Sequence, residues 1–144
     1  MHLVDLSVLI ALCDTAHEFH DKASAWFTTI RSAGWATCPL TENGLVRILG
    51  HPGYPGGPGS PDRARPLLKA LVRTPGHQFW PDDLSLCDPV AFPSLVHTSA
   101  ASLTDLYLLA LAIHHGGRFA TLDRRIRPDV LPGGAAALVV VPTA

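Results

Sequence analysis

The chain has 144 residues, of which 47% are hydrophobic and 16% charged, with eleven basic and twelve acidic side chains. This length fits one domain spanning residues 1–144, and the composition excludes a largely disordered protein. The formal net charge of -1 excludes a nucleic-acid binder that relies on a basic field over its whole surface. Any contact with a polyanion is therefore expected to be local.

The N-terminal stretch MHLVDLSVLIALCD is apolar, but no basic segment precedes it, and Asp5 and Asp14 interrupt it. We expect it to form the first structural element and not a signal peptide or membrane span. Cys13, Cys38 and Cys87 form no CxxC pair and lie in apolar or strand-like stretches, which favours buried thiols over disulfides. These features predict a cytoplasmic protein without a membrane contact.

Short strands alternate with helices along the chain. In order, the pattern predicts a strand at 2–4, helices at 7–13 and 17–32, a strand at 34–39, a helix at 40–50, a loop at 51–60, a helix at 60–76, a strand at 77–83, a helix at 104–115, and strands at 118–122 and 137–142. This alternation predicts an α/β fold, a three-layer α/β/α domain with a central, mainly parallel five-stranded sheet. Periodicity does not predict the strand order.

Capping residues define the ends of several predicted helices. Ser7, Thr41 and Ser60 are expected as N-caps, and Gly50 is expected to end the helix that begins at 40. Gly44 is a mild cost inside that helix. The loop between these helices, HPGYPGGPGS, lacks the Gly-Lys-Ser/Thr of a P-loop, so it is expected to flank the site or to contact a partner.

Four acidic residues are expected at one edge of the sheet. Asp5 and Asp123 follow predicted strands, and Glu42 and Asp105 open predicted helices. Each acid alone is explained by the preference of first helical turns for carboxylates, about 0.3–1 kcal/mol. Four of them at the edge formed by the carboxyl ends of the strands repel one another, however, and a bound cation supplies the missing attraction.

Carboxylate oxygens without nearby His or Cys suit Mg²⁺ or Mn²⁺ and not zinc. An ion so held activates water and polarises a phosphoryl oxygen, which makes phosphodiester hydrolysis the natural chemistry. Ser7 and Thr121 lie two residues from Asp5 and Asp123, so their hydroxyls are candidates to hold a metal-bound water or a phosphate. Capping by Ser7 and strand packing by Thr121 explain the same residues equally well.

Four segments follow one another in a characteristic order: LVDLSVLIAL with Asp5, LTENGLVRIL with Glu42, TDLYLLALA with Asp105 and FATLDRRI with Asp123. Together they resemble the PIN-domain ribonucleases, in particular the VapC toxins of bacterial toxin–antitoxin pairs. The resemblance implies that these four acids bind Mg²⁺ or Mn²⁺ and activate water to cut RNA. Many members read Asp-Thr-Asn at the first motif, whereas this chain reads Asp5-Leu6-Ser7.

The same resemblance implies a homodimer, a cognate VapB-like antitoxin that covers the acidic cleft, and a structured RNA target, often a transfer RNA. Basic residues near the acids fit such a substrate; they are Arg47, Arg118, Arg124, Arg125 and Arg127. Solvated surface arginines are an equally good explanation for any single one.

Several alternatives compete with this interpretation. A haloacid-dehalogenase-like phosphohydrolase needs an aspartate where Ser7 stands, and a receiver domain needs a lysine late in the chain. Cys13, His17 and His20 form an incomplete zinc set. A catalytically silent domain that binds RNA or a partner stays open as a different class of function. His114 and His115 are explained by the last turn of a helix, and Trp26, Trp35 and Trp80 by the core.

Overall fold

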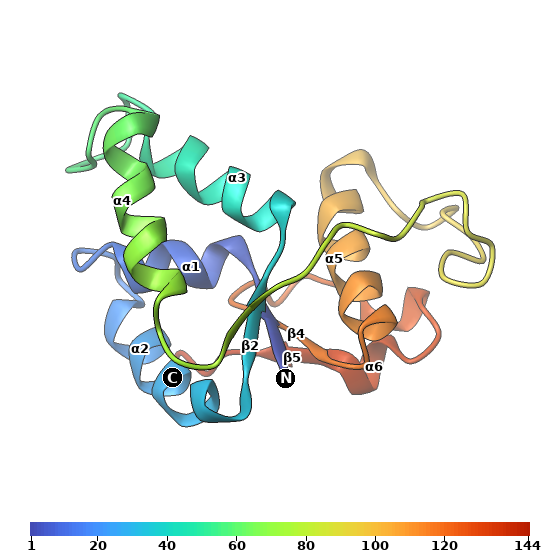
Figure 1. The fold of residues 1–144 in the computed structure, drawn as a ribbon. Coiled ribbons are helices and arrows are strands. Elements are labelled where there is room, and N and C mark those ends of the chain that lie inside the picture. The colour runs from blue at the N-terminus through green and yellow to red at the C-terminus, as the bar shows by residue number, and fades with distance from the viewer.

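Five parallel strands form one sheet in the computed structural model, which describes all 144 residues (Figure 1). The strands are β1 (His2–Val4), β2 (Trp35–Thr37), β3 (His77–Phe79), β4 (Arg118–Thr121) and β5 (Leu138–Val140). Their order is β3-β2-β1-β4-β5, and every neighbouring pair is parallel. The predicted five-stranded parallel sheet is therefore confirmed.

Helices cover both faces of this sheet. They are α1 (Leu6–Cys13), α2 (His20–Ile30), α3 (Pro39–Leu49), α4 (Pro61–Val72), α5 (Leu103–His114) and α6 (Gly134–Ala137), with short 3-10 turns at Arg31–Ala33, Ala100–Ser102 and Pro128–Val130. Helices α1 to α4 lie on one side of the strands and α5 and α6 on the other (Figure 1). The predicted three-layer α/β/α class is confirmed.

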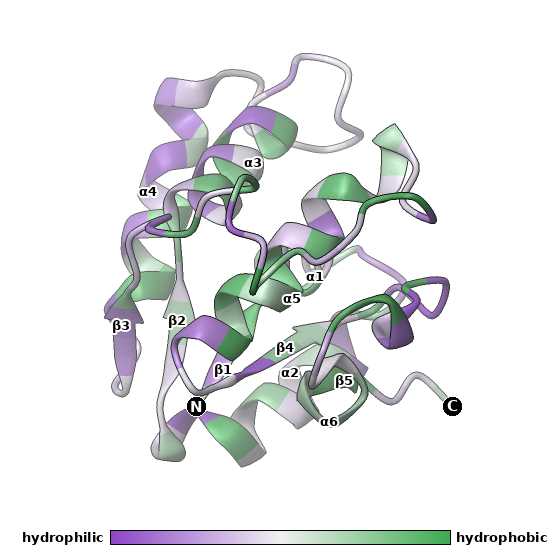
Figure 2. Cartoon of the chain, turned by 90° about the vertical axis from the view of Figure 1, so that its right-hand side faces the viewer, coloured by the Kyte–Doolittle hydropathy of each residue, from purple (hydrophilic) through white to green (hydrophobic).

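Successive strand residues point to opposite faces and divide the core into two halves. Leu3 and Phe119 belong to the apolar cluster around α5, whereas Val4 and Ala120 belong to the cluster around α1. Helix α5 is buried without interruption from Leu106 to Ala112, and Figure 2 shows it as a largely hydrophobic helix. Because both faces are covered, the strands need no polar side.

Two of the predicted caps are wrong, and both helices begin earlier than expected. Asp5, not Ser7, caps α1, because its extended backbone lets the side chain accept from the N–H of Leu6. Helix α3 begins at Pro39, whose fixed φ suits the first helical position, with Cys38 as N-cap. Thr41 is the third residue of α3, where its hydroxyl oxygen accepts from the Cys38 N–H as part of a capping box.

The cap of α4 is confirmed, since the Ser60 hydroxyl accepts from the N–H of Arg63. Helix α2 begins at His20 and not at 17, because the ring of His17 accepts from the N–H of Phe19 and closes a turn there. No helix is long and apolar enough to span a membrane.

The cysteines only partly follow the prediction. All are free thiols, but Cys87 is exposed in the segment between β3 and α5, because that segment forms turns over the surface and no strand. Cys38 is buried and Cys13 half-buried, and burial raises the pKa of each of these thiols to about 11. Trp35 and Trp80 are buried as predicted, whereas Trp26 is only partly covered.

Candidate active site

The strand order places a crevice at the ends of β1 and β4. Strands β2 and β3 continue the sheet on one side of β1, and β4 and β5 continue it on the other, so the chain reverses its direction of winding between β1 and β4. Ligand sites in open parallel sheets form at such a switch point, outside the carboxyl ends of the strands. Asp5 follows β1 directly and Asp123 lies two residues beyond the end of β4.

Asp5 is held rigidly at this point. Its side chain is buried, with 5% of the residue exposed. The Oδ1 atom accepts from the Leu6 N–H at 2.7 Å, and the Oδ2 atom accepts from the hydroxyls of Ser7 at 2.9 Å and Thr121 at 2.6 Å. Burial, with the nearby charge of Asp123 adding to it, raises the pKa of Asp5 despite these bonds.

The two hydroxyls also join β1 to β4. Ser7 Oγ accepts from the N–H of Leu122 at 3.1 Å, and Thr121 Oγ1 accepts from the N–H of Asp123 at 3.0 Å. Each hydroxyl therefore accepts one hydrogen bond from a backbone N–H and donates one hydrogen bond to Asp5. Ser7 and Thr121, the two hydroxyls that the sequence placed beside the acids, both bond to the carboxylate of Asp5.

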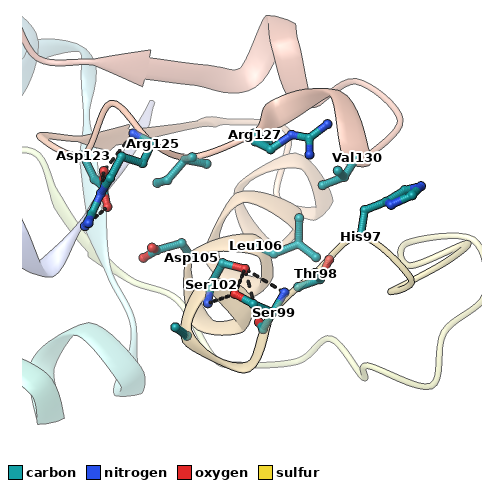
Figure 3. Close-up of a pocket in the computed structure, with 12 residues that line it drawn as sticks. His97, Thr98, Ser99, Ser102, Asp105, Leu106, Asp123, Arg125, Arg127 and Val130 are labelled. Carbon is teal, nitrogen blue, oxygen red and sulfur yellow. Dashed lines mark hydrogen bonds and ion pairs between the residues drawn. The ribbon is translucent and has the colours of Figure 1, made fainter.

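Asp123 is hydrogen-bonded to Arg125, which lies two residues further along the same segment (Figure 3). Its Oδ1 atom accepts from the backbone N–H and the Nε of Arg125, at 2.8 and 3.0 Å, and its Oδ2 atom accepts from the Arg125 Nη2 at 3.1 Å. These bonds lower the pKa of Asp123. Asp123 therefore stays ionised and oriented while Asp5 is pushed toward its neutral form.

Asp105 lies in the first turn of α5 and faces the same crevice. It accepts no hydrogen bond from the protein, and its half-buried carboxyl has a pKa raised to about 6. Burial is the main cause, and the charges of Asp5 and Asp123 add to it. The three aspartates are thus close enough to repel one another, although they come from three different elements.

A cavity of about 380 Å³ opens beside Asp105 and Asp123. Figure 3 shows it between the start of α5 and the segment that follows Asp123. Its lining combines polar and apolar side chains and consists of His97, Thr98, Ser99, Ala101, Ser102, Asp105, Leu106, Asp123, Arg125, Ile126, Arg127 and Val130. Hydroxyls and guanidinium groups thus line the same cavity as the two carboxylates.

Glu42 takes part in a separate network on the neighbouring strand. Its Oε1 atom accepts from the hydroxyl of Thr37, the last residue of β2, at 2.7 Å. The same hydroxyl lies 2.8 Å from Nε2 of His77 in β3. Burial lowers the pKa of His77, and the charge of Glu42 opposes that shift. Glu42 therefore reaches the predicted edge, but its charge acts on His77 and not on the three aspartates.

The predicted arginines fall into different places. Arg125 and Arg127 line the cavity, and Arg124 donates to Thr143 near the C-terminus. Arg47 is exposed in the last turn of α3. Arg118 begins β4, so the length of that strand, about 10 Å, separates it from the acidic edge. The structure does not bring Arg118 to the site.

The side chains Cys13, His17 and His20 do not assemble into a zinc site. The ring nitrogens of His17 and His20 are used in backbone hydrogen bonds, to the Phe19 N–H at 3.0 Å and the Ala11 carbonyl at 2.7 Å. One other group does gather ligand atoms within 4.8 Å of one another: Asp83, His114 and His115. Sequence reasoning missed this group, and its only signal was the pairing of an Asp-Asp doublet with a His-His doublet.

The crevice therefore gathers three carboxylates, two oriented hydroxyls and an arginine-lined cavity at the switch point of a parallel sheet.

The family profile described as PIN domain matches residues 2–128. Three relatives come from Mycobacterium tuberculosis. Ribonuclease VapC44 is 41% identical over 131 residues, covering 91% of this chain and 92% of the relative. Ribonuclease VapC39 is 38% identical over the same length, covering 91% and 94%. Ribonuclease VapC29 is 38% identical over 141 residues, covering 98% of each chain. The chain belongs to the PIN-domain family, among its VapC-type ribonucleases.

Proposed function

We propose that this protein is a metal-dependent endoribonuclease that hydrolyses phosphodiester bonds of RNA at the acidic crevice. The observation that carries the proposal is the meeting of Asp5, Asp105 and Asp123 at the switch point of the sheet, where burial and the other two charges raise the pKa of Asp105 to about 6. A bound cation would offset the repulsion between these carboxylates and stabilise their ionised form. The relatives named as ribonucleases support the same reaction.

The donor atoms at this edge fit a hard divalent ion. Asp5, Asp105 and Asp123 offer carboxylate oxygens, and the hydroxyls of Ser7 and Thr121 lie beside them, which makes a set of oxygen donors. We assign Mg²⁺ or Mn²⁺ to these aspartates, with Glu42, in the first turn of α3, as the fourth acid of the set. When bound, the ion supplies an activated water and polarises a phosphoryl oxygen.

The protein's own residues prepare the site for that chemistry. Ser7 and Thr121 hold Oδ2 of Asp5 in one orientation, so no reorganisation is needed at the moment of reaction. Arg125 orients Asp123 and is 90% exposed at its side chain, which lets the guanidinium turn toward a phosphate. Arg127 lines the same cavity. Such contacts position a nucleic acid without reading its sequence.

The biological role follows from the VapC-type relatives. The protein acts in the cytoplasm as the toxin of a toxin–antitoxin pair, cleaves a structured RNA such as a transfer RNA, and is inhibited by a cognate VapB-like antitoxin. It works as a homodimer built from single-domain chains spanning residues 1–144. A catalytically silent RNA- or partner-binding domain, or another Mg²⁺-dependent phosphohydrolase, is the alternative.

The direct test uses the full-length protein purified without a partner. It is incubated with total transfer RNA in Mg²⁺ or Mn²⁺, with and without chelator, beside the variants Asp5→Asn and Asp62→Asn. Asp62 is an exposed acid in the first turn of α4, far in sequence from the crevice, and is the matched control. Cleavage is expected in wild type and Asp62→Asn, and its loss in chelator and in Asp5→Asn.

Circular dichroism and thermal melting establish that Asp5→Asn is folded. Cleavage that survives both chelator and Asp5→Asn overturns the metal-nuclease proposal. RNA binding without cleavage, in folded wild-type protein with either ion, favours the silent domain. The toxin role is tested separately by inducing expression in bacteria with and without a small co-encoded DNA-binding protein. Growth arrest that the second protein relieves is expected.

A further inference from the structure

Two histidines and an aspartate meet at the end of the molecule away from the acidic crevice. Nε2 of His115 lies 2.9 Å from Oδ1 of Asp83, and Nε2 of His114 lies 3.7 Å from the same oxygen. All three ligand atoms lie within 4.8 Å of one another. His114 is the last residue of α5, His115 is its C-cap, and Asp83 belongs to the segment that follows β3.

This group is a separate place from the nuclease crevice. Asp105 lies in the first turn of α5 and His114 ends the helix nine residues later, which corresponds to a rise of about 13 Å. The donor set differs too, with two imidazole nitrogens and one carboxylate oxygen against the carboxylates and hydroxyls of the crevice. The two sites therefore suit different metals.

We propose that Asp83, His114 and His115 form a zinc site. Two imidazoles and a carboxylate are the three protein ligands of many zinc centres, which keep a fourth position for water or another donor. Zinc bonds of about 2.0–2.1 Å place tetrahedral ligand atoms about 3.3 Å apart. The two distances to Asp83 Oδ1, 2.9 and 3.7 Å, lie on either side of that separation. Small side-chain rotations are enough to accept the ion.

The surroundings hold one ligand in place and leave the others accessible. The ring of Trp80 stacks on His115 at a centroid distance of 4.4 Å and an interplanar angle of 13°. Trp80 is buried, which fixes the imidazole plane before any ion arrives. The side chains of His114 and Asp83 are 45% and 46% exposed, so an ion reaches them from solvent.

A zinc ion at this position ties two distant parts of the chain together. Asp83 begins the long connection between β3 and α5, and both histidines end α5, just before β4 starts. The exposed Val90 and Val96 lie further along the same connection, 81% and 77% exposed. Zinc therefore adds a restraint near the start of a segment that Leu84 and Phe92 anchor in the core. The proposal does not depend on the nuclease assignment.

The experiment measures Zn²⁺ binding to the full-length Asp5→Asn protein by isothermal titration calorimetry, in a large excess of Mg²⁺. This background weakens the acidic crevice and occupies what is left of it. We expect one Zn²⁺ per chain. His114→Ala and Asp83→Asn are each expected to weaken binding at least about tenfold, the smaller loss known for removing even an outer partner of a metal site. His51→Ala, in an exposed loop, is the matched control and should bind normally.

A second measurement reports on the geometry directly. Co²⁺ substituted for Zn²⁺ should give the visible absorption of a tetrahedral ion and quench the fluorescence of Trp80, and the quenching should disappear in Trp80→Phe. No Zn²⁺ binding, binding that survives both His114→Ala and Asp83→Asn, or a loss in His51→Ala equal to theirs overturns the proposal. In the first case the group is only a hydrogen-bonded His–Asp contact.

Discussion

The hydroxyl of Thr121 donates a 2.6 Å hydrogen bond to Oδ2 of Asp5, which joins the last residue of β4 to the residue that follows β1. The Oγ1 atom of Thr121 in turn accepts from the N–H of Asp123 at 3.0 Å. One side chain thus connects two of the proposed metal ligands across neighbouring strands. Thr121 is itself fully buried, so its geometry is set by the core and not by solvent.

Thr121→Val should disable the crevice without unfolding the protein. Valine keeps the shape of threonine but removes both the donor to Asp5 and the acceptor for Asp123. We expect a loss of about 10- to 100-fold in metal affinity or RNA cleavage, the usual effect of removing a partner of a ligand. Because the Thr121 bond lowers the pKa of Asp5, its loss should also move the onset of metal binding to higher pH.

Thr121→Ser keeps the hydroxyl and is the control for this experiment. It should retain most of the activity and the wild-type pH profile. If Thr121→Val and Thr121→Ser lose activity to the same extent, the methyl group and not the hydrogen bond is what matters, and the positioning role is wrong.

Removing the charge of Asp105 should stabilise the metal-free protein near neutral pH. The folded pKa of about 6 lies above the ordinary value of 3.8, so the folded state binds this proton more tightly than the unfolded chain does. The free energy of unfolding therefore falls as pH rises from about 4 to about 6, and stays low above that. Asp105→Asn lacks this penalty.

The prediction is checked by urea unfolding in chelator at about pH 4 and about pH 7.5. The variant should gain stability over wild type at the higher pH, and the gain should shrink at the lower one. With Mg²⁺ present the order should reverse, since an ion that binds the folded state stabilises the protein that binds it better. A pH-independent difference between the two proteins contradicts the assigned pKa.

Much of the crevice could be predicted because strand ends are visible in the sequence. Asp5 and Asp123 follow apolar strands and Asp105 opens an apolar helix, so the parallel topology alone brings them to one edge. The role of Ser7 and Thr121 was less accessible. Their hydroxyls bond to a carboxylate rather than cap a helix or meet solvent, and that depends on β1 and β4 being neighbours.

Other features depend on contacts that periodicity does not contain. Arg118 is near Asp123 in sequence, yet a strand runs between them and separates their side chains. Asp83 and His115 are distant in sequence and meet because the segment after β3 packs against the end of α5. The network of Thr37, Glu42 and His77 likewise needs the pairing of β2 with β3.

Arg125→Ala should separate metal binding from RNA binding. The side chain of Arg125 donates to both carboxylate oxygens of Asp123, so its truncation removes these two bonds and leaves only the backbone N–H on Oδ1. We expect Mg²⁺ affinity without RNA to rise by up to about fivefold, the scale of an exposed ion pair. RNA affinity should fall and depend less steeply on salt, because one phosphate contact is lost.

Arg124→Ala is the control, since Arg124 is exposed and donates to Thr143 away from the cavity. Calorimetry gives the metal affinity, and filter binding over a series of salt concentrations gives the RNA affinity. Weaker Mg²⁺ binding in Arg125→Ala contradicts the competition, and an identical effect of both variants on RNA shows only a general loss of positive charge.

Gly50→Ala should destabilise the fold at the junction of α3 and α4. Gly50 ends α3 as expected, and its φ of -82° is one that any residue adopts. The glycine is needed for space: a Cβ there would lie 2.5 Å from the Val46 carbonyl oxygen and 2.6 Å from the nitrogen of Pro61. Neither backbone atom moves without shifting a helix, so we expect a loss of about 1–3 kcal/mol in the free energy of unfolding. Gly53→Ala, whose Cβ meets only the exposed ring of His51, should cost less. Urea unfolding compares the two, and equal stability of both variants would show that α3 and α4 separate freely at Gly50.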